Sequence, residues 1–260
     1  MSDTTQTHES PVEQPGLPLF YKKPTLLRFE EHKDLALKRS DNLRFAAKSN
    51  AIPIVTGEFV AALRSFPIVF TGDQVPVPVV VLGLENEKNL FIDGFGSWRK
   101  GAYVPAYVRR YPFISLKIEE GQQLLCADLS SDRIVKAGRH GAEPLFNDNG
   151  GATPSTESIM ALCQAMNDDY VQTLEFARTI KEAGLLVQKH ADVTLNDKRR
   201  FTLDGFYVVD PDAFRALPAE TLHAWNRNGW LELLVLHIAS QNNWQELMEL
   251  QVSSTAKATG

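Results

Sequence analysis

A glycine-rich stretch, GFGSWRKG at residues 94–101, has the spacing of a phosphate-binding loop. Gly96 and Gly101 are separated as in a Walker loop, where a lysine and a hydroxyl residue follow to hold the β- and γ-phosphates and magnesium. Ala102 and Tyr103 occupy those two positions here. Because the lysine and hydroxyl are missing, the sequence predicts no nucleotide-binding loop in this stretch.

Two His-x-Asp tripeptides have the spacing of an iron-binding facial triad, which a distant histidine would complete. They are His32 with Asp34 and His190 with Asp192. That chemistry is typical of double-stranded β-barrels, whereas the sequence around a possible third ligand, His223, has a helical pattern. Such tripeptides also arise easily by chance in a chain of this length. We therefore expect no metal site, no cofactor and no assignable catalytic residue.

The strongest concentration of unusual side chains lies within residues 91–113. Its aromatic residues are Phe91, Phe95, Trp98, Tyr103, Tyr107, Tyr111 and Phe113, and its cations are Arg99, Lys100, Arg109 and Arg110. Aromatic rings beside guanidinium groups can bind a peptide, an aromatic ligand or an anion. The candidate binding residues are Trp98, Arg99, Tyr103, Tyr107, Arg109, Arg110 and Tyr111. The alternative is that these side chains are scaffold, with the rings covering a sheet and the arginines paired internally.

The bulk composition limits the functions that these residues can serve. The chain is 43% hydrophobic and carries a formal net charge of −5, whereas a nucleic-acid-binding surface is usually basic. No apolar run reaches the roughly 20 residues that span a bilayer, and residues 1–20 lack a secretory signal pattern. Cys126 and Cys163 are the only cysteines, so there is no disulfide framework. We expect a cytoplasmic protein with no membrane span and no nucleic-acid partner.

The domain organisation follows from the composition along the chain. Residues 1–16 are polar and proline-containing, and we expect them to be a disordered tail. Residues 17–250 are expected to form a single domain, and residues 251–260 a second disordered tail.

Strand patterns dominate the middle of the chain. The β-branched and aromatic runs lie at residues 67–71, 75–85, 89–93, 113–119 and 123–129. Most of the links between them are short enough for antiparallel hairpins. Short helices are expected just upstream, at residues 58–65, and at residues 103–110. The sequence thus predicts one mainly antiparallel sheet over about residues 67–129.

Helical periodicity replaces the strand pattern after about residue 152. Thr153 and Pro154 form a favourable helix start, and Gly184 is a natural C-terminal stop. Further helices are expected from Pro218 to Gly229, over residues 230–240, and from Asn243 to near Leu250. An extra hairpin is predicted near residues 193–209. Strands followed by helices indicate an α+β fold in which C-terminal helices pack on the sheet.

The same aromatic segment carries a family resemblance. Residues 89–113, with the distinctive core YVPAYVRRYPF, resemble the central signature of the SapC family of bacterial proteins. The blocks at residues 20–37, 51–73 and 203–248 fit the same family, so the resemblance covers roughly residues 20–250. The name is shared with an unrelated peptide-permease subunit, which would need several membrane helices.

The resemblance implies a link to export of bacterial surface-layer proteins and supplies no catalytic residues. Two hypotheses therefore remain. In the first, the chain is a non-enzymatic accessory protein of a cell-surface or outer-membrane protein system, and it binds a polypeptide partner through residues 91–113. In the second, it is an enzyme or small-ligand-binding protein with its site on the same segment. The sequence does not indicate an oligomeric state.

Overall fold

The computed structural model describes residues 17–117, 123–194 and 200–256, and it has the predicted α+β fold with antiparallel strand pairing. The strands are β1 (Pro24–Leu26), β2 (Leu35–Lys38), β3 (Ala51–Pro53), β4 (Ile68–Phe70), β5 (Pro78–Val81), β6 (Phe113–Lys117), β7 (Gln123–Asp128), β8 (Ile134–Lys136), β9 (Ala142–Pro144), β10 (Leu186–Thr194) and β11 (Arg200–Val209). The α-helices are α1 (Phe29–His32), α2 (Phe59–Ala62), α3 (Ala106–Arg109), α4 (Pro154–Glu182), α5 (Pro211–Arg215), α6 (Ala219–Arg227), α7 (Trp230–Ser240) and α8 (Asn243–Ala256). Two 3-10 helices are η1 (Arg44–Ala46) and η2 (Thr56–Glu58).

Three antiparallel sheets organise these strands. One has five strands in the order β10–β11–β4–β5–β3, and two have three strands each, β1–β7–β6 and β8–β2–β9. The prediction of one sheet over residues 67–129 is therefore wrong in this respect, because β4 and β5 lie in a different sheet from β6 and β7. Residues 89–93 form no strand, and Ile92 makes only an isolated bridge with Trp98.

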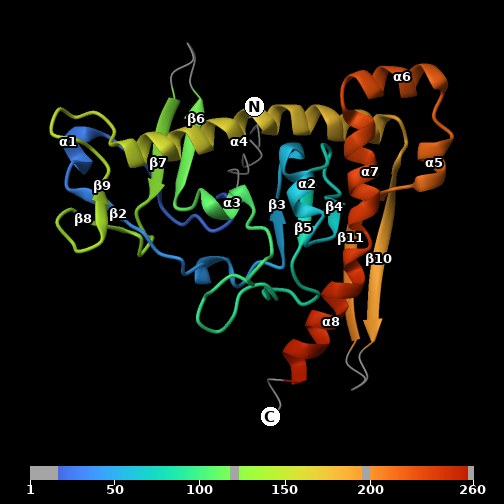
Figure 1. Cartoon of the computed structure of the whole chain (residues 1–260), viewed down its shortest axis with the longest axis horizontal. Helices are drawn as coiled ribbons and strands as arrows, with labels where there is room; N and C mark the ends of the chain where they lie inside the picture. Colours follow the sequence, from blue (N-terminus) through green and yellow to red (C-terminus); the bar gives the residue numbers. More distant parts are fainter. Residues whose placement is uncertain (1–16, 118–122, 195–199, 257–260) are drawn as a thin grey trace, which may run out of the picture.

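Pairing with distant parts of the chain explains this division. β3 pairs with one edge of β5, where Ala51 lies opposite Val81. β1 pairs with one edge of β7, where Pro24 lies opposite Asp128. The irregular segment between β5 and α3 then carries the chain away from the five-stranded sheet (Figure 1). As a result the later hairpin builds a separate sheet.

The predicted extra hairpin is confirmed and is longer than expected. β10 and β11 pair from Leu186↔Val209 to Thr194↔Arg200. Residues 195–199, which connect the two strands in sequence, lie outside the described residues. Tyr207 of β11 pairs with Phe70 of β4, so the hairpin extends the five-stranded sheet.

The long helix α4 begins and ends where the sequence predicts. The Thr153 side chain accepts a hydrogen bond from the Thr156 backbone N–H, Pro154 is the first helical residue, and Gly184 has a φ of +71° just beyond the C-terminus. Positive φ suits glycine because it has no Cβ. Figure 1 shows α4 running along the length of the molecule, past both the β1–β7–β6 sheet and the five-stranded sheet.

Two hydrophobic clusters lie under α4. Cys163 belongs to a small cluster with Phe113 and Leu145, whereas Phe176 and Ile180 belong to the main core. Because the helix crosses from one cluster to the other, its buried face shifts along its length. Tyr170, which lies between the two clusters along the helix, is 43% exposed, while Thr173 and Phe176 are buried.

The C-terminal helices pack on the five-stranded sheet, as predicted. Gly229, with a φ of +75°, separates α6 from α7. The Asn243 side chain donates to the Leu63 and Phe66 carbonyls and so ties the start of α8 to the chain beside α2. α8 continues past the predicted end near Leu250 to Ala256, with Gln251 buried.

Candidate functional site

The tip of the segment from residue 91 to 113 is a tight turn at residues 93–97, which we call the Phe95 turn. One Asp93 carboxylate oxygen accepts backbone hydrogen bonds from Phe95 at 2.9 Å and Ser97 at 2.8 Å. Gly96 has a φ of +88°, and a Cβ there would lie 2.3 Å from the Asn42 side chain, so this position requires glycine. The Phe95 side chain is 83% exposed.

A second segment holds the Phe95 turn in place. The Asn42 side-chain amide donates to the Phe95 carbonyl at 2.9 Å, and the Leu43 backbone N–H donates to the Gly96 carbonyl at 2.7 Å. The Arg44 guanidinium donates to the Gly94 carbonyl. Because three consecutive carbonyls of the turn are bound from outside, the exposed position of Phe95 is fixed by the fold.

A hollow of about 750 Å³ lies beside the Phe95 turn, and we call it the aromatic hollow. Its lining comes from residues 88–100, except Gly96, and from Leu250, Ser253 and Ser254 of α8. The half-buried Trp98 ring stacks on Phe91, with ring centroids 6.3 Å apart. Its Nε1 is buried and has no hydrogen-bond partner among the described residues. The hollow thus has an aromatic wall, and the unpaired Trp98 donor lies buried behind it.

Three cations and one carboxylate, Asp93, line the aromatic hollow, and two of the cations pair with carboxylates outside its lining. Lys88 pairs with Glu85 at 2.7 Å and Arg99 pairs with Glu246 at 3.3 Å, while Lys100 has no ion-pair partner among the described residues. Both pairs are partly solvent-exposed, and such pairs typically contribute only ~0–1 kcal/mol. Their cations can therefore exchange partners at low cost.

Tyr103 is held against a buried carboxylate. Its hydroxyl donates to Glu58 Oε1 at 2.9 Å, and the same oxygen accepts from the Ala106 backbone N–H at 2.7 Å. Burial, reinforced by the negative charge of Glu58, raises the pKa of Tyr103 to about 12. Arg109 donates to the Tyr103 hydroxyl at 3.2 Å and to the Val104 carbonyl at 3.1 Å.

Tyr107 and Arg110 form a second internal pair. The Arg110 guanidinium lies 4.3 Å from the Tyr107 ring centroid, one turn along α3. Arg110 is buried, and its Nε has no partner among the described residues. Burial raises the pKa of Tyr107, and the nearby Arg110 charge partly offsets this.

Tyr111 is buried at the end of the segment. Its ring stacks on Phe45 with centroids 4.2 Å apart, and its hydroxyl donates to Asp128 at 3.3 Å. Asp128 also accepts backbone hydrogen bonds from Lys22 and Lys23, so it joins Tyr111 to the chain before β1. Burial raises the pKa of the Tyr111 hydroxyl.

A second hollow, of about 250 Å³, lies beyond Tyr111, and we call it the arginine hollow. Its lining residues are Leu37, Lys38, Arg39, Ser40, Asp41, Arg109, Arg110, Tyr111, Phe113, Arg133, Ile159 and Leu162. The structure therefore does not bring all seven predicted residues into one surface. Trp98 and Arg99 line the aromatic hollow, whereas Arg109, Arg110 and Tyr111 line the arginine hollow. Tyr103 and Tyr107 line neither hollow.

Several residues of these hollows were not among the predicted ones. Phe95 could have been recognised from its DGFGS context, in which aspartate and two glycines mark a tight turn. Arg133, Lys38 and Arg39 reach the arginine hollow from strands or turns far away in the sequence. Nothing in the spacing of these cations signals their proximity.

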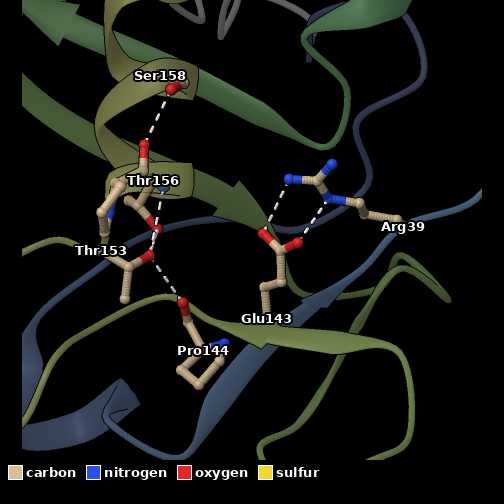
Figure 2. Close-up of polar contacts among 7 residues, drawn as sticks. Arg39, Glu143, Pro144, Thr153, Thr156 and Ser158 are labelled. Atoms are coloured by element: carbon tan, nitrogen blue, oxygen red, sulfur yellow. Dashed lines mark hydrogen bonds and ion pairs between the residues drawn. The ribbon is translucent and has the colours of Figure 1, made fainter.

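Internal contacts hold the N-terminus of α4 (Figure 2), beside a hollow of about 490 Å³ that is lined by Arg39, Glu143 and the first turn of the helix. Arg39 pairs with Glu143 at 2.8 Å, and hydrogen bonds to Ser155 and Arg39 lower the pKa of Glu143. The Thr153 hydroxyl donates to the Pro144 carbonyl at 2.9 Å. Since these groups are satisfied internally, this end of α4 is an anchor for β9.

The histidines and cysteines do not form a metal site in the described residues. His237 is fully buried in α7, where burial lowers its pKa to about 3 and its Nε2 accepts from the Val209 backbone N–H at 3.0 Å. Cys126 and Cys163 are both free and buried, and burial raises the pKa of Cys163 to about 11. A thiol with a raised pKa is a poor nucleophile at neutral pH.

Comparison with known proteins bears on the family alone. No curated protein and no solved structure matches the chain. Among the described residues, no helix is both long enough and apolar enough to cross a bilayer. The profile of the SapC family matches residues 27–247, a span that contains the arginine hollow, all of α4 and the part of the aromatic hollow formed by residues 88–100. The chain therefore belongs to the SapC family.

Proposed function

We propose that the chain is a non-enzymatic binding protein that recognises a polypeptide at the Phe95 turn and the aromatic hollow. The observation that carries the proposal is the 83% exposure of Phe95 on a turn that two segments hold in place. A rigid exposed aromatic ring loses little conformational entropy on binding, and aromatic anchors supply much of the energy at interfaces. In this proposal Trp98 and Arg99 contact the partner, while Tyr103 and Tyr107 hold the segment in place.

The charges of the aromatic hollow indicate the partner's chemistry. Lys88, Arg99 and Lys100 line the hollow, whereas its one lining carboxylate, Asp93, is occupied by the turn. A peptide with an apolar side chain flanked by acidic residues would complement this surface. The link of the SapC family to surface-layer export supports a component of a bacterial cell-surface or outer-membrane system as the partner, with recognition in the cytoplasm.

A library of short immobilised peptides tests this proposal. The wild-type protein should enrich peptides that contain an apolar residue beside Asp or Glu. Phe95→Ser should weaken the best of them at least about tenfold, because it removes the anchor. Its Tm should stay within a few degrees of the wild type, since the side chain makes few internal contacts.

Val60→Ser is the matched control, because Val60 is an exposed apolar residue on α2 outside the hollow. It should bind the same peptides as the wild type. Unchanged enrichment by Phe95→Ser would refute the proposal. The second candidate function, binding of a small ligand, is favoured by the concentration of cations in the arginine hollow.

A further inference from the structure

The arginine hollow concentrates positive charge in a chain whose net charge is −5. Five of its lining residues are cationic, namely Lys38, Arg39, Arg109, Arg110 and Arg133, and one, Asp41, is acidic. They come from the end of β2 and the residues after it, from the end of α3 and the residue after it, and from the turn before β8. The fold therefore gathers these cations from three separate parts of the chain.

Three of the arginines have no carboxylate within ion-pair distance among the described residues. Arg39 is the exception, because Glu143 pairs with it. Arg133 donates to the carbonyls of Tyr111 at 3.2 Å, Ser40 at 2.6 Å and Asn42 at 3.0 Å. Carbonyls orient a guanidinium without neutralising it, and the more distant carboxylates of Asp132 and Asp41 compensate the charge of Arg133 only in part.

The remaining two arginines are held by uncharged groups. Arg109 bonds to the Val104 carbonyl and the Tyr103 hydroxyl, and Arg110 lies over the Tyr107 ring. Arg110 is only 9% exposed, and its Nε has no partner among the described residues.

Burial makes the charges of Arg110 and Arg133 costly, whereas Arg109 is exposed. Burial lowers the pKa of Arg133, which reflects the loss of solvation around its charge. Phe113, Ile159 and Leu162 add apolar surface to the same hollow. A buried charge is stable only when it is paired or well hydrogen-bonded, and the attraction between opposite charges strengthens in such surroundings. An anion in the hollow would supply the missing pairing.

The size of the hollow and the chemistry of its arginines define the anion. About 250 Å³ admits a small molecule and is too small for a folded segment of another protein. Planar guanidinium groups bind the oxygens of phosphate or carboxylate in pairs. Two or three guanidinium groups facing one hollow match an ion with more than one negative charge.

We propose that the arginine hollow binds a phosphoryl group, either as free phosphate or as part of a small phosphomonoester. Arg110 and Arg133 hold the oxyanion, and Lys38 and Arg109 contribute charge at the mouth. This site is separate from the aromatic hollow, so it can be present whether or not the peptide proposal holds.

Titration of the full chain with inorganic phosphate and with glycerol phosphate tests the site, with sodium chloride at matched ionic strength as reference. Both binding, by calorimetry, and Tm should respond saturably to phosphate and not to chloride. Equal affinities would identify free phosphate as sufficient, and tighter binding of the ester would identify a phosphorylated metabolite. No response beyond that to chloride would overturn the proposal.

Variants assign the response to the hollow. Arg110→Met keeps the aliphatic stem and should weaken phosphate at least about tenfold, because it removes a charge-assisted hydrogen-bond donor. Lys38→Gln changes an exposed side chain and should weaken phosphate several-fold without affecting folding. Lys48→Gln removes an equally exposed lysine that lies outside the hollow and should bind as the wild type does. The site would also be refuted if Arg110→Met and Lys38→Gln both bound phosphate with wild-type affinity. If Arg110→Met does not fold, wild-type affinity of Lys38→Gln alone would refute it.

Discussion

Glu58 holds the start of α3 through three hydrogen bonds, and its removal should destabilise the protein strongly. The carboxylate is buried and accepts from the Val55 N–H at 3.0 Å, the Tyr103 hydroxyl at 2.9 Å and the Ala106 N–H at 2.7 Å. Hydrogen bonds to charged groups contribute roughly 1.5–3 kcal/mol each, and they are not fully additive. We expect Glu58→Ala to lower the free energy of unfolding by about 4 kcal/mol, because it leaves two backbone donors unsatisfied.

Two milder variants divide this effect among the three bonds. Tyr103→Phe removes one bond and should cost about 1.5–3 kcal/mol. Glu58→Gln replaces one acceptor oxygen by a donor, so at least one N–H loses its partner, at a cost of about 1–3 kcal/mol. Glu58→Ala combined with Tyr103→Phe should lose less than the sum of these two single variants, because both remove the bond between Glu58 and Tyr103.

Urea unfolding followed by circular dichroism measures these differences. Val60→Ala, on the exposed side of α2, is a control for changes near Glu58 that break none of its bonds. If Glu58→Ala lost less than about 1 kcal/mol, or if Glu58→Ala and Tyr103→Phe were strictly additive, the buried carboxylate would not hold Tyr103 as described.

Two further predictions concern the core and the alkaline limit of stability. Phe176→Ala should lower the free energy of unfolding in urea by about 3–5 kcal/mol, because this buried ring contacts Phe59, Phe70 and Trp230. A decrease of less than about 1 kcal/mol would contradict its place in the core. The pKa of Tyr103 is raised from 10.0 to about 12, so its contribution to stability should be complete below about pH 10 and should be lost as the pH rises toward 12. In unfolding experiments at a series of pH values, the free energy of unfolding of Tyr103→Phe should fall less steeply with rising pH than that of the wild type. The same pH dependence in both proteins would disprove the assignment.

Local signals in the sequence predicted the helices well. Thr153, Pro154 and Gly184 mark the ends of α4 because capping depends on residues within one turn of the helix end. Gly229 likewise separates α6 from α7. These features need no knowledge of distant contacts, so single residues were enough to place them.

The sheets could not be predicted equally well, because strand partners are chosen across long stretches of chain. Alternating apolar residues indicate a strand and say nothing about which edge it joins. The pairing of β1 with β7 joins Pro24 to Asp128, and that of β11 with β4 joins Tyr207 to Phe70. The apolar run at residues 89–93 became the wall of a hollow instead of a strand.

In the candidate site, too, contacts between distant parts of the chain could not be predicted from local signals. Aromatic and basic residues that are close in sequence were expected on one surface, yet Arg110 lies over Tyr107 and Arg109 donates to Tyr103. Much of this segment therefore pairs with itself. The arginine hollow depends on Arg133 and Lys38, whose proximity to Arg110 follows only from the three-dimensional fold.

The passage of α4 between two hydrophobic clusters restricts how the length of this chain can change. Cys163 faces one cluster and Phe176 the other, on a continuous helix of 29 residues. Each added residue turns the following part of a helix by about 100° and advances it by about 1.5 Å. One residue inserted between these two positions would thus rotate one contact face into solvent. Seven inserted residues would nearly restore the rotation, but they would move the two contact faces about 10 Å further apart along the helix axis. Insertions and deletions are therefore tolerated far better in the loops than in this helix, whose residue count fixes both the spacing and the relative rotation of the two clusters.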